Sequence, residues 1–403
     1  MDLRDSEQTG TTANNTQQSI LPTSPLDPSN DSISVPRSPD RPLVPLSPLE
    51  LLPTEIHIEI IKRAAEPTDA RPEYASLCKL AHTSPVFTKL AQAQLYQNLV
   101  LLDEATTREW LESAATIRGE FATRELQLGC TDEEEESISA TSCEEVLAFQ
   151  TSDLEELTLF GMKDVRSSSL ISSPVSPASH LTPVEADDMW VGLRTLRLVE
   201  SVLVDDGSEI VVDFRLRELV VHGSPLPPRY LFSVIESSSA SITKLGLRFE
   251  RGFDWSPLTS LPSPAFRQLE ALTLFGFDVP PLACLSRCGT LKKLALVRIT
   301  SNVPDPLSQL RKELASLPNP TLIEFHVDLR YIARDGGVVT LRELEELIEI
   351  PSLANLEQFM PRLPGSMDAS DVGILEGIKG KKGKLVVEVA LCESIAFAVV
   401  FSR

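Results

Sequence analysis

Few residues in this 403-residue sequence have the types and spacings that perform chemistry. His57 and Glu59 could supply a zinc ligand and a general base, but no Pro-Cys-x-x-Cys pair follows to complete a metal site. Cys284 and Cys288 stand four residues apart without a second pair of metal ligands. The basic, glycine-rich stretch 377–384 lacks the spacing of a phosphate-binding loop. We therefore predict no catalytic residue, no metal and no cofactor. We interpret the His-x-Glu pair as a solvated helix face and the two cysteines as ordinary thiols.

The composition restricts the kinds of partner. The net charge is −21, which argues against a nucleic-acid-binding surface and against docking on anionic membranes. No apolar run approaches 18 residues, and the first 20 residues lack the apolar segment of a secretory signal. The six cysteines are scattered, as in a reduced intracellular protein. We expect a cytoplasmic or nuclear protein with no nucleic acid or membrane partner.

The sequence contains an internal repeat. LEELTLFGM from Leu154 and LEALTLFGF from Leu269 share seven of nine residues. Weaker relatives begin at residues 193, 216, 242, 291 and 322, with the shared pattern apolar-x-x-apolar-x-apolar. The second apolar position of the pattern recurs at residues 157, 196, 219, 245, 272, 294 and 325. Most of these intervals scatter about a period of roughly 25 residues, which is typical of leucine-rich repeats.

We predict an α/β fold in which each apolar-x-apolar segment is a short parallel strand of an irregular leucine-rich-repeat solenoid over 101–403. ELQL at 125–128 would be a degenerate first copy. The Asn or Cys expected after the last leucine is absent, since Met162, Ser201 and Phe277 stand there. We expect 341–350 and 353–359 to be helical, and 377–384 to be a turn before a closing strand, KLVVEVA.

Three stretches are too polar to pack. Residues 1–45 are rich in Ser, Thr, Asn, Gln and Pro, which predicts a disordered tail. Residues 131–145 are acidic and serine-rich, and 165–188 are rich in serine and proline. We expect the last two to be flexible insertions in the solenoid.

Residues 46–100 have a different pattern, which predicts three short helices. Apolar residues at helical spacing predict a helix over 53–65, which Pro67 and Pro72 end. A second helix is expected from Tyr74 to about Thr83, and Pro85 opens a third.

This helical region resembles the F-box, over roughly residues 48–96. LPTEI matches the family's opening at Leu52, Pro53, Glu55 and Ile56. FTKLA matches its closing segment, with Phe87 where the family usually has Trp. Ser84 stands where Cys is common, and the loop at 67–72 departs from the usual turn. A repeat array after such a segment is the arrangement of the F-box/leucine-rich-repeat family. The alternative is an ordinary helical hairpin that caps the solenoid.

The resemblance implies a non-catalytic substrate receptor of an SCF-type cullin-RING ubiquitin ligase, docked on its Skp-type adaptor. Leu52 and Pro53 would insert at the adaptor surface, Ile56, Ile60 and Leu77 would add apolar contact, and Phe87 would anchor the third helix. Ile56 and Ile60 could equally be internal to the helical bundle. The alternative function is an interaction scaffold without a ligase link.

The partner at the other end would be a protein substrate, which the sequence does not identify. We expect it to bind residues between and just after the repeat leucines, because they line one extended surface. The candidate contacts are Phe160, Arg197, His222, Arg248, Phe275 and His326. The two phenylalanines are candidate anchors, unless neighbouring loops cover them.

Overall fold

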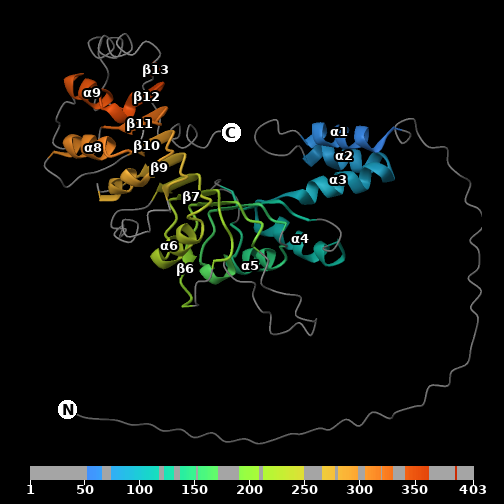
Figure 1. Ribbon diagram of the computed structural model, residues 1–403. Helices are drawn as coiled ribbons and strands as arrows, with labels where there is room; N and C mark the ends of the chain where they lie inside the picture. The colour runs from blue at the N-terminus through green and yellow to red at the C-terminus, as the bar shows by residue number, and fades with distance from the viewer. Residues whose placement is uncertain are drawn as a thin grey trace, which may run out of the picture. The chain divides into compact units, whose positions relative to one another are not determined.

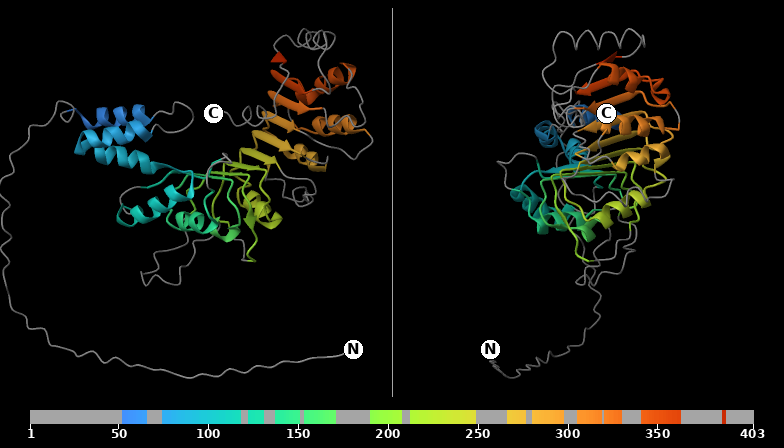
Figure 2. Two further views of the ribbon diagram at one scale, coloured as in Figure 1. Left: turned by 180° about the vertical axis from the view of Figure 1, so that it is seen from behind. Right: turned by 90° about the vertical axis from the view of Figure 1, so that its left-hand side faces the viewer.

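The computed structural model describes residues 52–65, 74–117, 122–130, 137–150, 153–170, 190–207, 212–248, 266–276, 280–297, 305–318, 320–329, 341–362 and 386–387. The tail expected at 1–45, the turn at 377–384 and most of the insertion at 165–188 lie outside them. Figures 1 and 2 show the elements along the chain. The α-helices are α1 (Thr54–Ala65), α2 (Tyr74–Thr83), α3 (Pro85–Gln97), α4 (Glu104–Ile117), α5 (Ala140–Ala148), α6 (Pro228–Ser237), α8 (Pro306–Ala315) and α9 (Leu341–Ile348).

The strands form two parallel sheets. The smaller sheet pairs β4 (Val165–Arg166) with β6 (Leu203–Val204). The larger has eleven strands in the order β1-β2-β3-β5-β7-β8-β9-β10-β11-β12-β13. Its strands are β1 (Asn98–Leu101), β2 (Glu125–Leu128), β3 (Glu156–Phe160), β5 (Thr195–Val199), β7 (Glu218–His222), β8 (Lys244–Arg248), β9 (Ala271–Phe275), β10 (Lys293–Val297), β11 (Glu324–Asp328), β12 (Gln358–Arg362) and β13 (Val386–Val387).

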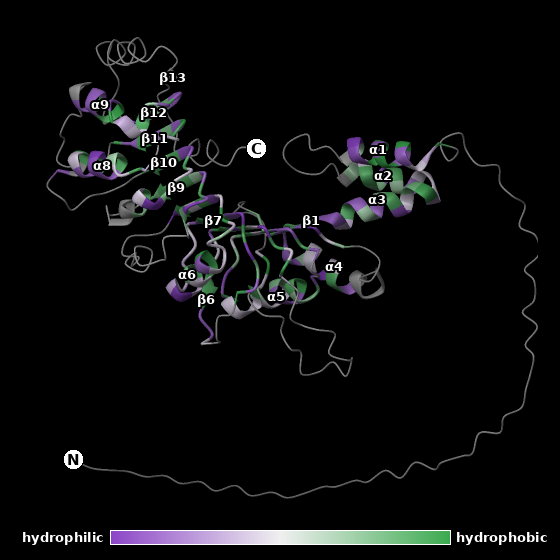
Figure 3. Cartoon of the chain, viewed as in Figure 1, coloured by the Kyte–Doolittle hydropathy of each residue, from purple (hydrophilic) through white to green (hydrophobic). Residues whose placement is uncertain are grey.

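The three predicted helices α1, α2 and α3 are present. Their shared core is Ile61, Leu77, Phe87 and Ala91. Ser84 starts α3, since its Oγ accepts a hydrogen bond from the Val86 backbone N–H at 3.2 Å. Figure 3 shows hydrophobic residues in green along these helices, beside hydrophilic ones in purple. The apolar sides of the three short helices therefore pack against one another to form this core.

The predicted strands are confirmed and lie in one uninterrupted register. Every repeat position identified in the sequence, from Leu157 to Phe325, sits directly beside its counterpart in the next strand. At each step one backbone carbonyl accepts bonds from two successive N–H groups of the next strand. Arg124 O, for example, accepts from the N–H groups of Glu155 and Glu156. This constant register places equivalent side chains in straight rows across the sheet, although the repeats differ in length.

The main core lies between the leucine rows and the helices. Leu157 and Leu159 of β3 belong to the same buried cluster as Val146 of α5, and the pattern continues with Leu231 of α6 and Leu310 of α8. Figure 2 shows these helices along one side of the stacked strands. One repeat could not bury its leucines alone, so stacking of neighbours is what stabilises the array.

Ser201 fills the position where the repeat pattern expects Asn. Its Oγ is fully buried, lies 3.1 Å from the Leu159 carbonyl oxygen, and accepts a hydrogen bond from Met162 N–H at 3.2 Å. Ser224 repeats the arrangement one step on, since its Oγ accepts from Ser201 N–H at 2.9 Å. A hydroxyl group therefore bridges adjacent turns of the solenoid, although the sequence pattern indicated only an absent Asn.

Three stretches differ from the sequence prediction. The stretch 353–359 is not helical, because its apolar residues complete a short 3-10 turn (Pro351–Leu353) and enter β12 at Gln358. The second half of the 131–145 stretch is not a loose insertion, because Ser139 caps α5 and Cys143 and Val146 are fully buried. Likewise Val165 is buried in β4 at the start of the 165–188 stretch.

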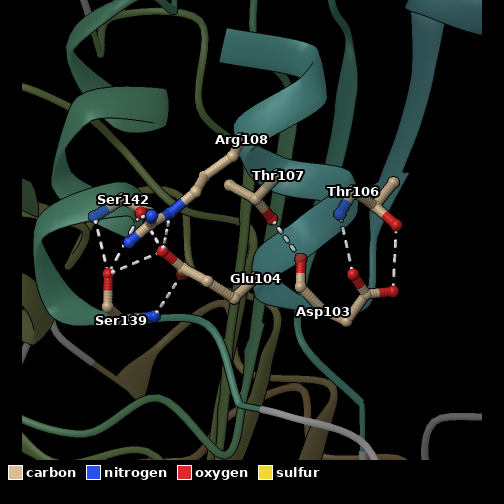
Figure 4. Close-up of polar contacts among 7 residues, drawn as sticks. All are labelled: Asp103, Glu104, Thr106, Thr107, Arg108, Ser139 and Ser142. Carbon is tan, nitrogen blue, oxygen red and sulfur yellow. Dashed lines mark hydrogen bonds and ion pairs between the residues drawn. The ribbon is translucent and has the colours of Figure 1, made fainter.

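Glu104 joins the starts of α4 and α5 (Figure 4). Its carboxylate accepts hydrogen bonds from Ser139 N–H at 2.8 Å and Ser142 Oγ at 2.7 Å, and pairs with Arg108 at 2.7 Å. Burial alone would raise the pKa of this carboxyl, but these hydrogen bonds outweigh it and lower the pKa to about 2. The ionised form therefore favours the folded state.

We expect Glu104→Gln to lower the free energy of unfolding at pH 7 by about 1–2 kcal/mol, below the full value of the pKa shift because water screens part of it. The sign follows from a folded-state pKa below the unfolded one. The contribution is complete above the ordinary pKa of 4.5 and disappears as the pH falls from 4.5 towards 2. Urea denaturation at pH 7 and pH 3 measures this change in the free energy of unfolding.

Glu109→Gln, on the exposed side of α4, is the control and should change the free energy of unfolding by less than about 0.5 kcal/mol. Equal effects at both positions would contradict the role of Glu104.

Candidate functional site

The face of the large sheet opposite the helices carries three rows of side chains. The first row contains Glu156, Thr195, Glu218, Lys244, Ala271, Lys293 and Glu324. The middle row contains Gln127, Thr158, Arg197, Val220, Gly246, Thr273, Ala295, His326 and Met360. The third row contains Phe160, Val199, His222, Arg248, Phe275 and Val297. We refer to this surface as the open face of the sheet.

Ion pairs cross between strands on the open face. Arg197 lies between Glu156, at 3.4 Å, and Glu218, at 2.7 Å. Lys244 also pairs with Glu218, at 3.4 Å, and Lys293 pairs with Glu324, at 3.0 Å. Opposite charges in neighbouring strands neutralise one another locally, so this part of the face presents no single sign of charge to a partner.

A second group on the open face is aromatic and cationic. The Arg248 guanidinium lies 4.3 Å from the centre of the Phe275 ring and contacts His222 Nε2. Burial and the nearby Arg248 charge lower the pKa of His222 to about 4. His222 is therefore neutral near pH 7, and Arg248 links it to Phe275 across β7, β8 and β9.

The open face has two halves that differ in exposure. Across β2 to β7 exposure alternates along the rows: Gln127, Phe160, Arg197 and Val199 are partly exposed, whereas Thr158 and Val220 are buried. From β9 onwards the middle and third rows are buried: Thr273 and Ala295 are both 0% exposed, and Val297 is 1% exposed. The two halves therefore offer different surfaces to a partner.

The six residues predicted to bind a substrate divide along this boundary. Phe160, Arg197, His222 and Arg248 lie on the open face and are partly exposed. Phe275 and His326 lie on the same face but are only 4% and 3% exposed. The strand pattern fixes the face of a side chain but says nothing about what covers that face. Phe275 and His326 are therefore not accessible for direct contact in this conformation.

The six residues predicted to contact an adaptor also divide. Leu52 and Ile56 are 37% and 45% exposed, and Pro53 is exposed beside them. Ile60 is half-buried, whereas Leu77 and Phe87 are 1% exposed in the core of the helical bundle. Helical spacing identified the apolar positions, but only packing separated internal from external ones.

The residues first considered for chemistry have structural roles. His57 is buried, contrary to the expected solvated position, with its ring edge-on to Phe87 at 5.0 Å, while exposed Glu59 pairs with Arg63. Cys284 and Cys288 are buried, and burial raises the pKa of the Cys284 thiol to about 12. A buried thiol of this kind is a poor nucleophile. Within the described segments no group of three or more His, Cys, Asp or Glu is placed to hold a metal ion.

A cavity of about 980 Å³ lies near the starts of β10, β11 and β12. Its lining includes Lys292, Ile323, Asn355 and Glu357 but no histidine or cysteine. It therefore does not join a nucleophile to a base of the kind that acyl transfer uses.

The parallel ladder of leucine-bearing strands decides the fold. It is a leucine-rich-repeat solenoid. No protein-family model matches the sequence, and no curated protein matches it. Solved structures that resemble it include the leucine-rich repeat-containing protein LegL7 from Legionella pneumophila, with a TM-score of 0.36, 13% identity, and coverage of 70% of this chain and 87% of LegL7. Another is the internalin InlF from Listeria monocytogenes, with a TM-score of 0.31, 12% identity, and coverage of 83% and 97%. At these TM-scores the fold assignment rests on the ladder itself.

None of the described helices is both long enough and apolar enough to cross a lipid bilayer.

Proposed function

We propose that this chain is the substrate receptor of an SCF-type ubiquitin ligase, in which the helical bundle docks on a Skp-type adaptor and the solenoid binds a protein substrate. The observation that carries the proposal is the placement of Leu52, Pro53 and Ile56. These residues match the F-box opening in sequence and are exposed at the start of the bundle.

The distribution of exposed apolar residues supports this interpretation. Among the described residues, seven large apolar side chains are exposed, and two of them, Leu52 and Ile56, stand four residues apart at the start of the helical bundle. An apolar group in water is unfavourable unless a partner covers it, so a pair of this kind favours a protein interface. Apolar anchors on a short helix are a common way to occupy a groove of a partner.

The buried positions then have a supporting role. Leu77 and Phe87, with Ala91 and Ile61, form the bundle core and hold α1 against α2 and α3. Direct contact with the adaptor is proposed for Leu52, Pro53 and Ile56, with Ile60 at the edge of the contact.

The mechanism needs no catalytic residue in this chain. A receptor that binds an adaptor at one end and a substrate at the other raises the effective concentration of a substrate lysine near the ubiquitin-loaded enzyme. The partly exposed half of the open face, with Phe160, Arg197 and Val199, is the surface proposed for the substrate.

The test is binding of the purified full-length chain to a purified Skp-type adaptor by calorimetry. Leu52→Ala/Pro53→Ala and Ile56→Ala are each expected to weaken binding at least tenfold, because they remove contact atoms at the centre of the interface. Ile58→Ala is the matched control. It removes an equally large exposed side chain (39% exposed) two positions along α1, which in a helix points to a different side, so binding should change less than about twofold.

If the folded wild-type chain does not bind the adaptor, the ligase proposal is wrong and the interaction scaffold without a ligase link is the better description. If Ile58→Ala weakens binding as much as Ile56→Ala, the proposed docking surface is wrong.

A further inference from the structure

The cavity near the starts of β10, β11 and β12 has no part in the proposed function. Its volume is about 980 Å³, at the upper end of the range of ligand pockets, which is about 300–1,000 Å³. Lys292, Ile323 and Glu357 directly precede the three strands, and all of them line the cavity. The cavity therefore crosses the strand starts at one edge of the sheet, on other strands than the surface proposed for the substrate.

Long turns between helix and strand form the walls of the cavity. Five residues, 288–292, connect the 3-10 helix η4 (Pro280–Arg287) to β10. Eight residues, 316–323, connect α8 to β11, and nine, 349–357, connect α9 to β12. The ladder has one constant register across these strands, so it cannot take up the extra residues. Pro320 and Asn355, one in each long turn, line the hollow that results.

Side-chain hydrogen bonds hold these turns in place. Asn355 Nδ2 donates to the Pro320 carbonyl oxygen at 2.5 Å, which links the turn before β12 to the turn before β11. Thr321 Oγ1 donates to the Leu291 carbonyl oxygen at 2.8 Å, which links the turn before β11 to the preceding repeat. The walls are therefore fixed before a ligand arrives, which lowers the entropic cost of binding.

The cavity combines aliphatic and acidic side chains. Ile323 is partly exposed, and Ile350 and Leu356 are 8% and 4% exposed. Glu349 and Glu357 are exposed, and neither has a cationic partner among the described residues. The aliphatic residues favour an apolar group in the ligand, and the two carboxylates favour a cationic group beside it.

Lys292, the one basic residue among the described residues of the lining, does not cancel this acidity. It pairs with Glu270 at 3.0 Å, and both side chains are half-exposed. Lys292 with Glu270, Glu349 and Glu357 carries a net charge of −2, since there is one cation and three carboxylates. The cavity therefore attracts a basic ligand and repels an acidic one.

We propose that this cavity binds an extended peptide segment of a protein partner, in which a Lys or Arg stands beside aliphatic residues. From β10 to β12 the distance is about 10 Å at a strand spacing of about 4.8 Å, which accommodates about three residues of extended chain. The aliphatic stem of a Lys or Arg can pack on apolar surface while its charged end reaches a carboxylate. The inference goes beyond the ligase proposal and does not depend on it, because it concerns a different edge of the solenoid.

The experiment selects linear peptides of about seven residues, long enough to extend past both ends of the cavity, from a random displayed library. The full-length chain is the target, and Glu349→Lys/Glu357→Lys is the counter-target, which removes peptides that bind elsewhere on the chain. Enriched peptides should contain Lys or Arg next to Leu, Ile or Val. The most enriched peptide is then synthesised, and its Kd is measured by fluorescence polarisation.

Matched variants separate recognition in the cavity from general attraction between opposite charges. Glu349→Lys/Glu357→Lys should weaken binding of the synthetic peptide by about tenfold or more, because two attractive contacts become repulsive. Glu109→Lys/Glu112→Lys makes the same change in net charge at exposed positions of α4 and should change the Kd by less than about twofold at physiological salt. Ile323→Ala should weaken binding by about threefold or more, because it removes apolar contact.

Circular dichroism shows whether each variant is folded. If Glu349→Lys/Glu357→Lys is unfolded, Glu349→Gln/Glu357→Gln takes its place, with an expected loss of about fivefold. The proposal is overturned if no peptide is enriched on the full-length chain over the folded counter-target, or if the enriched peptides lack basic residues. It is equally overturned if the substitutions on α4 weaken binding as much as those in the cavity.

Discussion

Replacing Gly129 by alanine is expected to lower the free energy of unfolding by about 4 kcal/mol. Gly129 has φ +79°, and a Cβ atom there would lie 2.1 Å from the Phe160 carbonyl oxygen and 2.6 Å from Met162 Cε. The left-handed backbone alone costs alanine about 1–2 kcal/mol. The contact with backbone oxygen adds a similar or larger cost, because the neighbouring repeat must move to relieve it.

Gly207→Ala is the matched control for this prediction. Gly207 has the same φ of +79°, but a Cβ atom there would meet nothing within 4 Å. Its loss should be only the backbone cost of about 1–2 kcal/mol. Equilibrium urea denaturation followed by circular dichroism gives both values. Similar losses at the two positions would show that the close approach between β2 and β3 does not constrain Gly129.

Phe325→Ala is expected to cost about 3–5 kcal/mol. Phe325 is fully buried, stands in register with Leu294 and Phe359, and has its ring centre 5.7 Å from that of Phe359. Truncation would leave a cavity in the leucine row near the end of the array, where neighbours on both strands are held in place by the backbone ladder. Phe325→Leu should cost about 1.5 kcal/mol or less, because leucine occupies this row in the preceding strands.

Phe160→Ala removes the same side chain from the opposite face of the sheet. Phe160 is partly exposed there, so the expected loss is about 1 kcal/mol or less. The same denaturation measurement compares the two. A Phe160→Ala loss as large as that of Phe325→Ala would mean that the open face is as tightly packed as the core, contrary to the exposure of its first half.

The sequence by itself determined the repeating elements. A leucine pattern with a period of about 25 residues is enough to predict parallel strands, because each copy has the same apolar positions and must pair with the next. The strands at Leu157 and Leu272 were predicted in this way and are confirmed. The helical spacing of Ile56, Ile60 and Ile61 similarly predicted α1.

Only the tertiary structure decided which side chains remain accessible. Periodicity assigns a residue to a face, but accessibility depends on neighbours that are distant in the sequence. Leu77 and Phe87 proved to be core residues of the bundle, whereas Leu52 and Ile56 stayed exposed. Phe160 and Phe275 occupy equivalent positions in nearly identical segments, yet the first is partly exposed and the second is buried beneath Arg248 from the adjacent strand.

The same reason explains the elements that the sequence missed. Residues 353–359 have a helical apolar pattern, but β11 offers unpaired backbone groups to the next segment, and β12 satisfies them. The hydroxyl of Ser201 replaces an expected Asn because it lies within reach of the Leu159 carbonyl and Met162 N–H of the preceding repeat. Local periodicity can be read directly from the sequence. Hydrogen bonds between distant segments, and the burial of one segment by another, form only when the chain has folded.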